Sequence, residues 1–155
     1  MSDLTLHLGQ TLRFDGDPTV DGPGAARHDT HGALAVQDGC LLDCGPAQAL
    51  RAAHPRATVI DHGAHLILPG FIDAHAHYPQ TAIIASWGKR LIDWLNSYTF
   101  PEEMRFDDPA YARGTAETYL DLLLAHGTTT VCSFCTIHPA SVDALFEAAA
   151  KRGMA

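Results

Sequence analysis

The sequence predicts an α/β protein in which a group of short strands precedes a parallel sheet with its covering helices. Residues 1–67 contain short apolar or β-branched stretches separated by Gly, Pro and Asp, a pattern typical of antiparallel β structure. Over residues 68–155, the apolar spacing changes from strand-like to helical and back, in the order strand, helix, strand, helix. That order is typical of βαβ units and predicts a parallel sheet.

The first part is predicted to be one side of a small β-sandwich. Its apolar stretches predict short strands at residues 3–8, 11–14, 33–37, 40–43 and 57–61. A tight turn is expected at Gly9–Gln10, and Asp38–Gly39 is a favourable hairpin turn. Residues 15–31 are rich in Gly, Pro and Asp, so we expect a loop there. Residues 46–53 are predicted to form a short helix with Pro46 in its first turn.

The second part is predicted to begin with a strand that starts at the apolar residues 66–68 and continues to His77. A second strand is expected at residues 128–135, which are β-branched and apolar. Three helices are predicted from apolar residues at helical spacing, marked by Leu91, Trp94, Leu95 and Tyr98, by residues 112–124, and by Val142, Leu145, Phe146 and Ala149.

The ends of these helices have sequence signals of their own. Pro101 is expected to end the first helix, because proline cannot continue the hydrogen-bond ladder. Asp107 or Asp108 can cap the second helix ahead of Pro109, and Gly127 supplies a stop. Ser141 is predicted to open the third.

Polar side chains at alternate positions distinguish the strand that ends at His77. Because side chains on a strand alternate between its faces, Asp73, His75 and His77 are expected on one face. Two imidazoles at positions i and i+2 can bind a single metal ion, with Asp73 as a hydrogen-bond acceptor for one of them. The alternative is a pair of unrelated histidines, with Asp73 serving as a loop anchor.

Longer segments around this strand carry a family resemblance. Pro69-Gly70-Phe71-Ile72-Asp73-Ala74-His75-Ala76-His77 resembles the first barrel strand of the amidohydrolase superfamily. Four further segments, in the same order as in guanine deaminases, resemble that branch of the superfamily: residues 77–80, 94–102, 127–134 and 136–138. The resemblance covers about residues 66–140, whereas residues 1–65 fit only loosely.

The resemblance implies the N-terminal portion of a (β/α)8 amidohydrolase barrel over residues 68–155, preceded by part of a β-sandwich over residues 1–67. It implies one zinc ion per active site, with His75 and His77 as its first two ligands. Such an ion would activate water to convert guanine to xanthine and ammonia. The segment from His77 to Gln80 would contact the substrate, and the complete enzyme would be a homodimer.

Other candidate residues have weaker support. The amide of Gln80 can donate and accept hydrogen bonds, which suits a purine edge, although a solvated loop amide is the alternative. Trp94 and Phe100 could flank a flat base, but aromatic residues at helical spacing are more often part of a core. His138 could face the mouth of the site, although a loop histidine is favoured. His126 is expected to make a favourable contact at a helix C-terminus.

The chain has 155 residues, whereas a complete barrel needs about 250. The expectation is therefore an N-terminal part of a larger enzyme that is inactive alone. The resemblance places the general acid and base, the remaining metal ligands and a base-holding arginine beyond residue 155. The alternatives are another amidohydrolase, acting on an aminopurine or a triazine, and a non-catalytic truncated remnant.

Composition narrows the function classes further. The net charge of −8 leaves no basic surface for nucleic acid, and no apolar run is long enough to span a membrane. The N-terminus lacks the pattern of a secretory signal, so a cytoplasmic location is expected. Cys132 and Cys135 lie three apart on a predicted strand and so face opposite sides, which argues against a shared zinc or redox site. All four cysteines are predicted to be structural.

Overall fold

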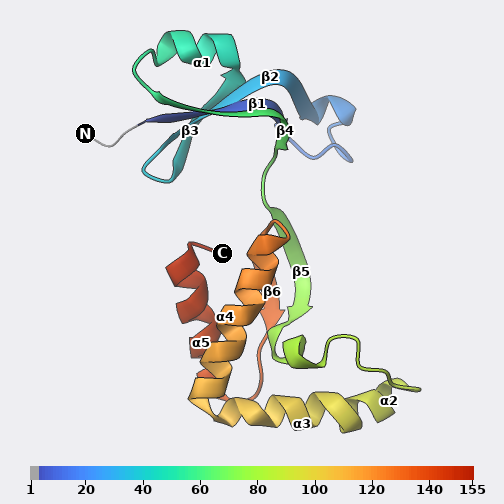
Figure 1. The fold of residues 1–155 in the computed structure, drawn as a ribbon. Coiled ribbons are helices and arrows are strands. Elements are labelled where there is room, and N and C mark those ends of the chain that lie inside the picture. Colours follow the sequence, from blue (N-terminus) through green and yellow to red (C-terminus); the bar gives the residue numbers. More distant parts are fainter. Residues whose placement is uncertain (1–3) are drawn as a thin grey trace. The chain divides into compact units, whose positions relative to one another are not determined.

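The protein is described by a computed structural model covering residues 4–155, which divide into two compact units between Pro69 and Gly70 (Figure 1). The first unit is a four-stranded sheet with the order β3-β2-β1-β4. Its elements are β1 (Thr5–Phe14), β2 (Ala26–Gln37), β3 (Cys40–Pro46), α1 (Ala47–Ala53) and β4 (Thr58–Ile67). β1–β2 and β2–β3 are antiparallel, whereas β1–β4 is parallel. The assignment of residues 1–67 to a sandwich stays a prediction.

Helix α1 covers one face of this sheet and forms its small core. Leu50 of α1 is buried against Leu6 and Leu8 of β1 and against Ala33 and Ala35 of β2. The predicted hairpin is confirmed, because Asp38 and Gly39, between β2 and β3, have φ angles of 53° and 75°. Two successive left-handed residues match the twist of the flanking strands.

The predicted turn at Gly9–Gln10 is wrong, because β1 runs unbroken from Thr5 to Phe14. The ladder to β2 only shifts register between Gly9 and Thr11. The predicted loop over residues 15–31 is also too long, since β2 begins at Ala26, opposite Phe14. Cross-strand pairing therefore overrides the local signals of glycine and polar residues.

The apolar residues 66–68 do not begin the histidine strand as predicted. Leu66 and Ile67 are the end of β4, where they pair with Gln10 and Thr11 of β1. The next strand, β5, starts only at Phe71, after the break at residues 68–70.

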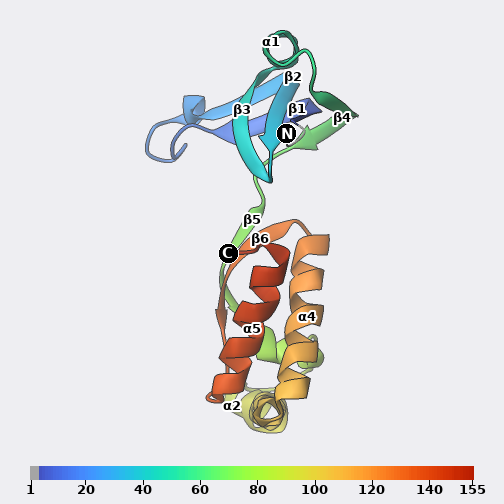
Figure 2. The same ribbon diagram turned by 90° about the vertical axis from the view of Figure 1, so that its left-hand side faces the viewer.

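The second unit contains a two-stranded parallel sheet of β5 and β6 with two long helices, as the strand–helix alternation predicts. Its elements are β5 (Phe71–His77), the 3-10 helix η2 (Tyr78–Ile83), α2 (Leu91–Trp94), the π-helix η3 (Leu95–Thr99), α3 (Phe100–Glu103), the 3-10 helix η4 (Met104–Asp107), α4 (Pro109–Ala125), β6 (Thr128–Phe134) and α5 (Pro139–Arg152). α4 and α5 lie side by side (Figure 2), and their contact forms the core of the unit. The core residues are Tyr78, Phe106, Ala112, Ala116, Tyr119, Leu120, Ala144, Leu145 and Ala148.

Pro101 does not end the first helical stretch, contrary to the prediction. Residues 91–107 form a nearly continuous rod in which a π-helix precedes α3, and Pro101 lies in the first turn of α3. A proline is tolerated in a first helical turn, where its missing N–H costs no ladder bond. The wider π-turn before it removes the conflict that the sequence pattern indicated.

The boundaries of α4 are confirmed. Asp108 caps its N-terminus by accepting a hydrogen bond from the Ala110 N–H at 2.9 Å, and Gly127 follows with a φ of 83°. Helix α5 begins at Pro139, two residues before the predicted Ser141. Within residues 4–155, no helix has the length and apolar character needed to cross a membrane.

Candidate metal and substrate site

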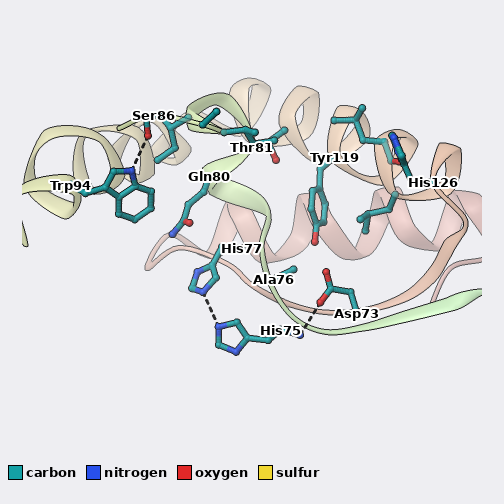
Figure 3. A pocket seen from close by; sticks show the side chains of 15 residues that line it. Asp73, His75, Ala76, His77, Gln80, Thr81, Ser86, Trp94, Tyr119 and His126 are labelled. Atoms are coloured by element: carbon teal, nitrogen blue, oxygen red, sulfur yellow. Dashed lines mark hydrogen bonds between the residues drawn. The ribbon is translucent and has the colours of Figure 1, made fainter. Parts of the chain in front are cut away.

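The C-terminal end of β5 opens into a cavity of about 760 Å³ (Figure 3). Its lining includes Asp73, His75, His77, Gln80, Ser86 and Trp94. The structure therefore gathers the predicted metal and substrate residues around one space. The carboxyl end of a parallel strand is also where active sites of α/β proteins usually lie.

His75 and His77 are positioned as a pair. Their Nε2 atoms are 3.3 Å apart, and Figure 3 shows the two rings converging. Two imidazole nitrogens bound to one tetrahedral zinc at about 2.0–2.1 Å would be separated by about 3.3–3.4 Å. Phe134, at the end of β6, stacks on His77 with a centroid separation of 4.7 Å. Its ring is tilted against that of His75, with the two centroids 5.3 Å apart. The donor set and spacing thus fit a metal ion.

Asp73 takes a different position from the one predicted for a carboxylate that orients an imidazole. Its Oδ1 accepts a hydrogen bond from the backbone N–H of His75 at 3.0 Å. In Figure 3 its carboxylate is directed toward Tyr119 and away from the imidazoles. The ladder to β6 shifts register between Asp73 and Ala76, which breaks the simple alternation of faces. Burial, and secondarily the charge of Asp73, raises the pKa of Tyr119.

Gln80 is held in the cavity wall by the residues that anchor η2. The Tyr78 side chain is fully buried, and its hydroxyl donates to the backbone carbonyl of Ser141 at 2.6 Å. The backbone N–H of Tyr78 donates to Ser133 Oγ at 3.1 Å, and Thr81 Oγ1 donates to the Tyr78 carbonyl at 2.6 Å. These bonds tie the turn after β5 to β6 and α5. Burial raises the pKa of Tyr78, so it stays neutral.

Trp94 lies on the opposite side of Gln80 from β5, as Figure 3 shows. The indole is half-buried, and its Nε1–H donates to Ser86 Oγ at 2.8 Å. The sequence pattern alone favoured a core position for this residue. The structure instead places its ring in the wall of the cavity.

Two other candidates lie elsewhere. His138 is outside the lining of this cavity, and its Nδ1 is 3.5 Å from Asp107 Oδ1. Phe100 is about half exposed and is also outside the lining. His126 lines the cavity far from the imidazole pair, and its Nδ1 contacts the Leu122 carbonyl at 2.8 Å, the helix C-terminal contact that was predicted.

Sequence reasoning missed Phe134, Tyr119 and Ser86. Parallel pairing of β5 with β6 places His77 beside Phe134, so the predicted sheet register could have found that contact. In the sequence, Tyr119 falls on the apolar face of a predicted helix, and no pattern singles it out. No local pattern marks Ser86, because its role depends on how the loop before α2 folds.

The four cysteines are free thiols and lie outside this cavity. Among residues 4–155, no group of three or more His, Cys, Asp or Glu side chains is arranged to hold a metal ion. The candidate metal site therefore consists of the two imidazoles.

Comparison with known proteins shows which family and which solved structures the chain resembles. Residues 66–155 match the Amidohydrolase family, and residues 32–57 match the bacterial imidazolonepropionase-like composite domain. The chain is 40% identical over 155 residues to the guanine deaminase of Escherichia coli K12, covering 97% of this chain and 35% of the relative. The chain thus spans about a third of the length of the curated relatives it matches.

Comparison with solved structures also finds guanine deaminases. The guanine deaminase of Bradyrhizobium japonicum superimposes with a TM-score of 0.92 at 36% identity, covering 98% of this chain and 34% of that one. The guanine deaminase of C. acetobutylicum, solved with bound guanine in its active site, gives a TM-score of 0.82 at 29% identity, covering 98% and 35% of the two chains. An atrazine chlorohydrolase of Arthrobacter aurescens TC1, complexed with zinc, shares the fold with a TM-score of 0.76 at 22% identity, covering 97% and 34%.

Proposed function

The chain belongs to the amidohydrolase family, and from this premise we propose that the protein is a guanine deaminase. The reaction consumes guanine and water and yields xanthine and ammonia. The observation that carries the proposal is the imidazole pair of His75 and His77, 3.3 Å apart, in the same cavity as Gln80. Identity of 40% to a guanine deaminase across nearly the whole chain favours guanine over other amidohydrolase substrates.

We propose that His75 and His77 hold a zinc ion through their Nε2 atoms. When bound, zinc acts as a Lewis acid and lowers the pKa of water to about 7, which supplies a nucleophile at neutral pH. Phe134 restricts both rings from one side, so the imidazoles are held with their nitrogens converging. The Asp73 carboxylate contributes indirectly, since it fixes the backbone of His75.

Gln80 and Trp94 are the proposed contacts to the base. The Gln80 amide offers a donor and an acceptor, which match the alternating groups on the edge of guanine. The flat indole of Trp94 offers a stacking surface for an aromatic base. Both side chains line the same cavity as the imidazoles. A base held there would therefore have its reacting carbon near the proposed metal ligands.

The proposed activity requires more than these residues supply. A catalytic zinc site usually takes three protein ligands, and residues 4–155 bring two together. Expulsion of ammonia also needs a proton donor, a role that we assign to none of residues 4–155. We further propose a cytoplasmic protein without nucleic-acid or membrane partners, supported by the net charge of −8 and the free thiols. The homodimer is proposed from the family resemblance alone.

The test is turnover by the purified, zinc-loaded whole protein, with xanthine and ammonia measured as products. We expect guanine to be consumed and adenine and aminotriazines to be left intact. His77→Asn should abolish zinc binding, measured by metal analysis, together with turnover. His138→Asn is the matched control, because that imidazole lies outside the cavity. Turnover of a triazine with guanine left unchanged would show a different amidohydrolase.

A further inference from the structure

The loop between η2 and α2 is folded closely around Trp94. Ile84 and Ala85 form the corner of a tight turn that is closed by a hydrogen bond from the Ser86 N–H to the Ile83 carbonyl at 3.0 Å. Ile84 has φ −52° and ψ 133°, and Ala85 has φ 64°. This is the geometry of a type II turn, in which the third position favours glycine. An alanine with positive φ is strained, so surrounding contacts must hold the turn in place.

The turn directs Ser86 at the indole. Ser86 Oγ accepts the Trp94 Nε1–H at 2.8 Å, and both residues line the cavity (Figure 3). The indole is tethered to the backbone through Cβ, so one hydrogen bond at Nε1, its single polar atom, also fixes the rotation of the ring about the Cβ–Cγ bond. The bond therefore sets which face of Trp94 is presented to the cavity.

Gly88 closes the loop on the other side of the same residue. A Cβ atom at Gly88 would lie 2.4 Å from Trp94 Cβ and 3.0 Å from Trp94 Cα, which is too close for any other residue without movement. Arg90 then binds Asp93 through two hydrogen bonds of 2.8 and 3.0 Å at the start of α2. Strain, a close backbone approach and a hydrogen bond thus converge on Trp94, although its ring is only half-buried.

A core tryptophan is fixed by the side chains packed around it, whereas the half-buried Trp94 is fixed by its hydrogen bond to Ser86 and its close contact with Gly88. We propose that Ser86 is a positioning residue, which holds the Trp94 indole as a flat wall against the purine ring of the substrate. The Gln80 amide then meets the edge of the same ring. This inference rests on the proposed function, because it takes guanine as the base in the cavity.

The first test uses the whole protein labelled with 5-fluorotryptophan and depleted of zinc, so that guanine is not consumed. The Trp94 fluorine signal is identified by its absence in Trp94→Phe. We expect guanine to shift this signal, and Ser86→Ala to move it in the unliganded protein. Ser86→Thr, which keeps the hydroxyl, should restore the original position. Ser97→Ala is the matched control, because its hydroxyl is exposed on the same helical rod.

The second test uses the zinc-loaded protein and separates KM from kcat. Loss of one neutral hydrogen bond that positions the wall should raise KM for guanine about two- to tenfold and leave kcat within about twofold. Ser86→Thr should recover most of the affinity, and Ser97→Ala should match the wild type. A merely structural role for Ser86 would lower stability and leave KM unchanged.

The outcomes distinguish this inference from the proposed function. The positioning role would be overturned if Ser86→Ala deaminated guanine with an unchanged KM, or if the Trp94 signal did not shift when guanine was added. Either result would leave the proposed reaction intact. A Trp94 signal that responds to guanine and depends on Ser86, in a protein that does not deaminate guanine, would support the positioning role and overturn the reaction.

Discussion

The 3.3 Å separation between the Nε2 atoms of His75 and His77, the proposed metal ligands, depends on their own strand and on a neighbouring aromatic ring. A strand places alternate side chains on one face, which was predictable from the sequence. The convergence of the nitrogens depends also on Phe134, which stacks on His77 from the neighbouring strand. The residue types of the site were therefore visible in the sequence, but the contacts that orient them required the pairing of β5 with β6.

Cys135 provides a prediction about pH at the residue scale. It packs partly buried against the core of the second unit, and burial raises the pKa of its thiol, whereas Cys132 is exposed. Because the thiolate is the reactive form, alkylation by iodoacetamide at pH 8–9 should be slower at Cys135 than at Cys132. Mass spectrometry of peptides after timed alkylation measures both rates in one sample.

The raised pKa of Cys135 also makes folding stability depend on pH. The unfolded chain loses the Cys135 proton near the ordinary thiol pKa of about 8.5, whereas the folded chain retains it to higher pH. The folded state therefore binds more protons, and stability falls as the pH rises above about 8.5. In the alkylation experiment, equal rates at Cys132 and Cys135 would contradict the burial of Cys135.

At the scale of elements, Gly70 explains why the histidine strand begins as it does. A Cβ at Gly70 would lie 2.0 Å from Thr129 Oγ1 and 2.4 Å from Thr129 Cγ2. The entry to β5 therefore passes directly over the start of β6, and only glycine leaves room for the threonine. This close approach occurs at the point where the two strands of the sheet begin to pair.

We predict that Gly70→Ala destabilises the protein by about 1–3 kcal/mol, the usual cost of overpacking. Adding Thr129→Ala should recover part of that loss, because it removes the two closest atoms and leaves only Thr129 Cβ, at 2.7 Å. Gly114→Ala in α4 is the control: nothing lies near its Cβ position, so it should stabilise the protein by about 0.5–1 kcal/mol. Urea unfolding measures all three variants, and a neutral Gly70→Ala would refute the close approach.

The secondary structure was predictable where local signals agree with the pairing of strands. Asp108 and Gly127 mark the ends of α4 because capping is a local interaction. Asp38–Gly39 marks a hairpin for the same reason. Gly9 failed as a turn signal because the long β2 strand pairs across it, and Pro101 failed as a stop because a π-helix precedes it. Both failures depend on neighbours that a local pattern does not contain.

At the scale of the whole molecule, apolar surface is the dominant feature of the second unit. Ile84, Trp87, Leu91, Ile137 and Phe146 are each between 68% and 86% exposed. The sheet beneath has two parallel strands, although parallel sheets are normally larger and covered on both faces. Where such side chains form a contiguous patch beside an open sheet edge, the surface usually contacts another polypeptide.

The 155-residue chain, expressed alone, is therefore expected to self-associate rather than remain a 16.6 kDa monomer. Light scattering coupled to gel filtration should give a mass well above that value, and an apolar dye should bind strongly. Association should weaken in a variant that replaces Ile84, Trp87 and Leu91 with Ser, Gln and Lys, because these three exposed side chains lie in the loop before α2 and at its first residue. A single monomeric peak with a cooperative thermal transition would show that the chain tolerates its apolar surface without a partner.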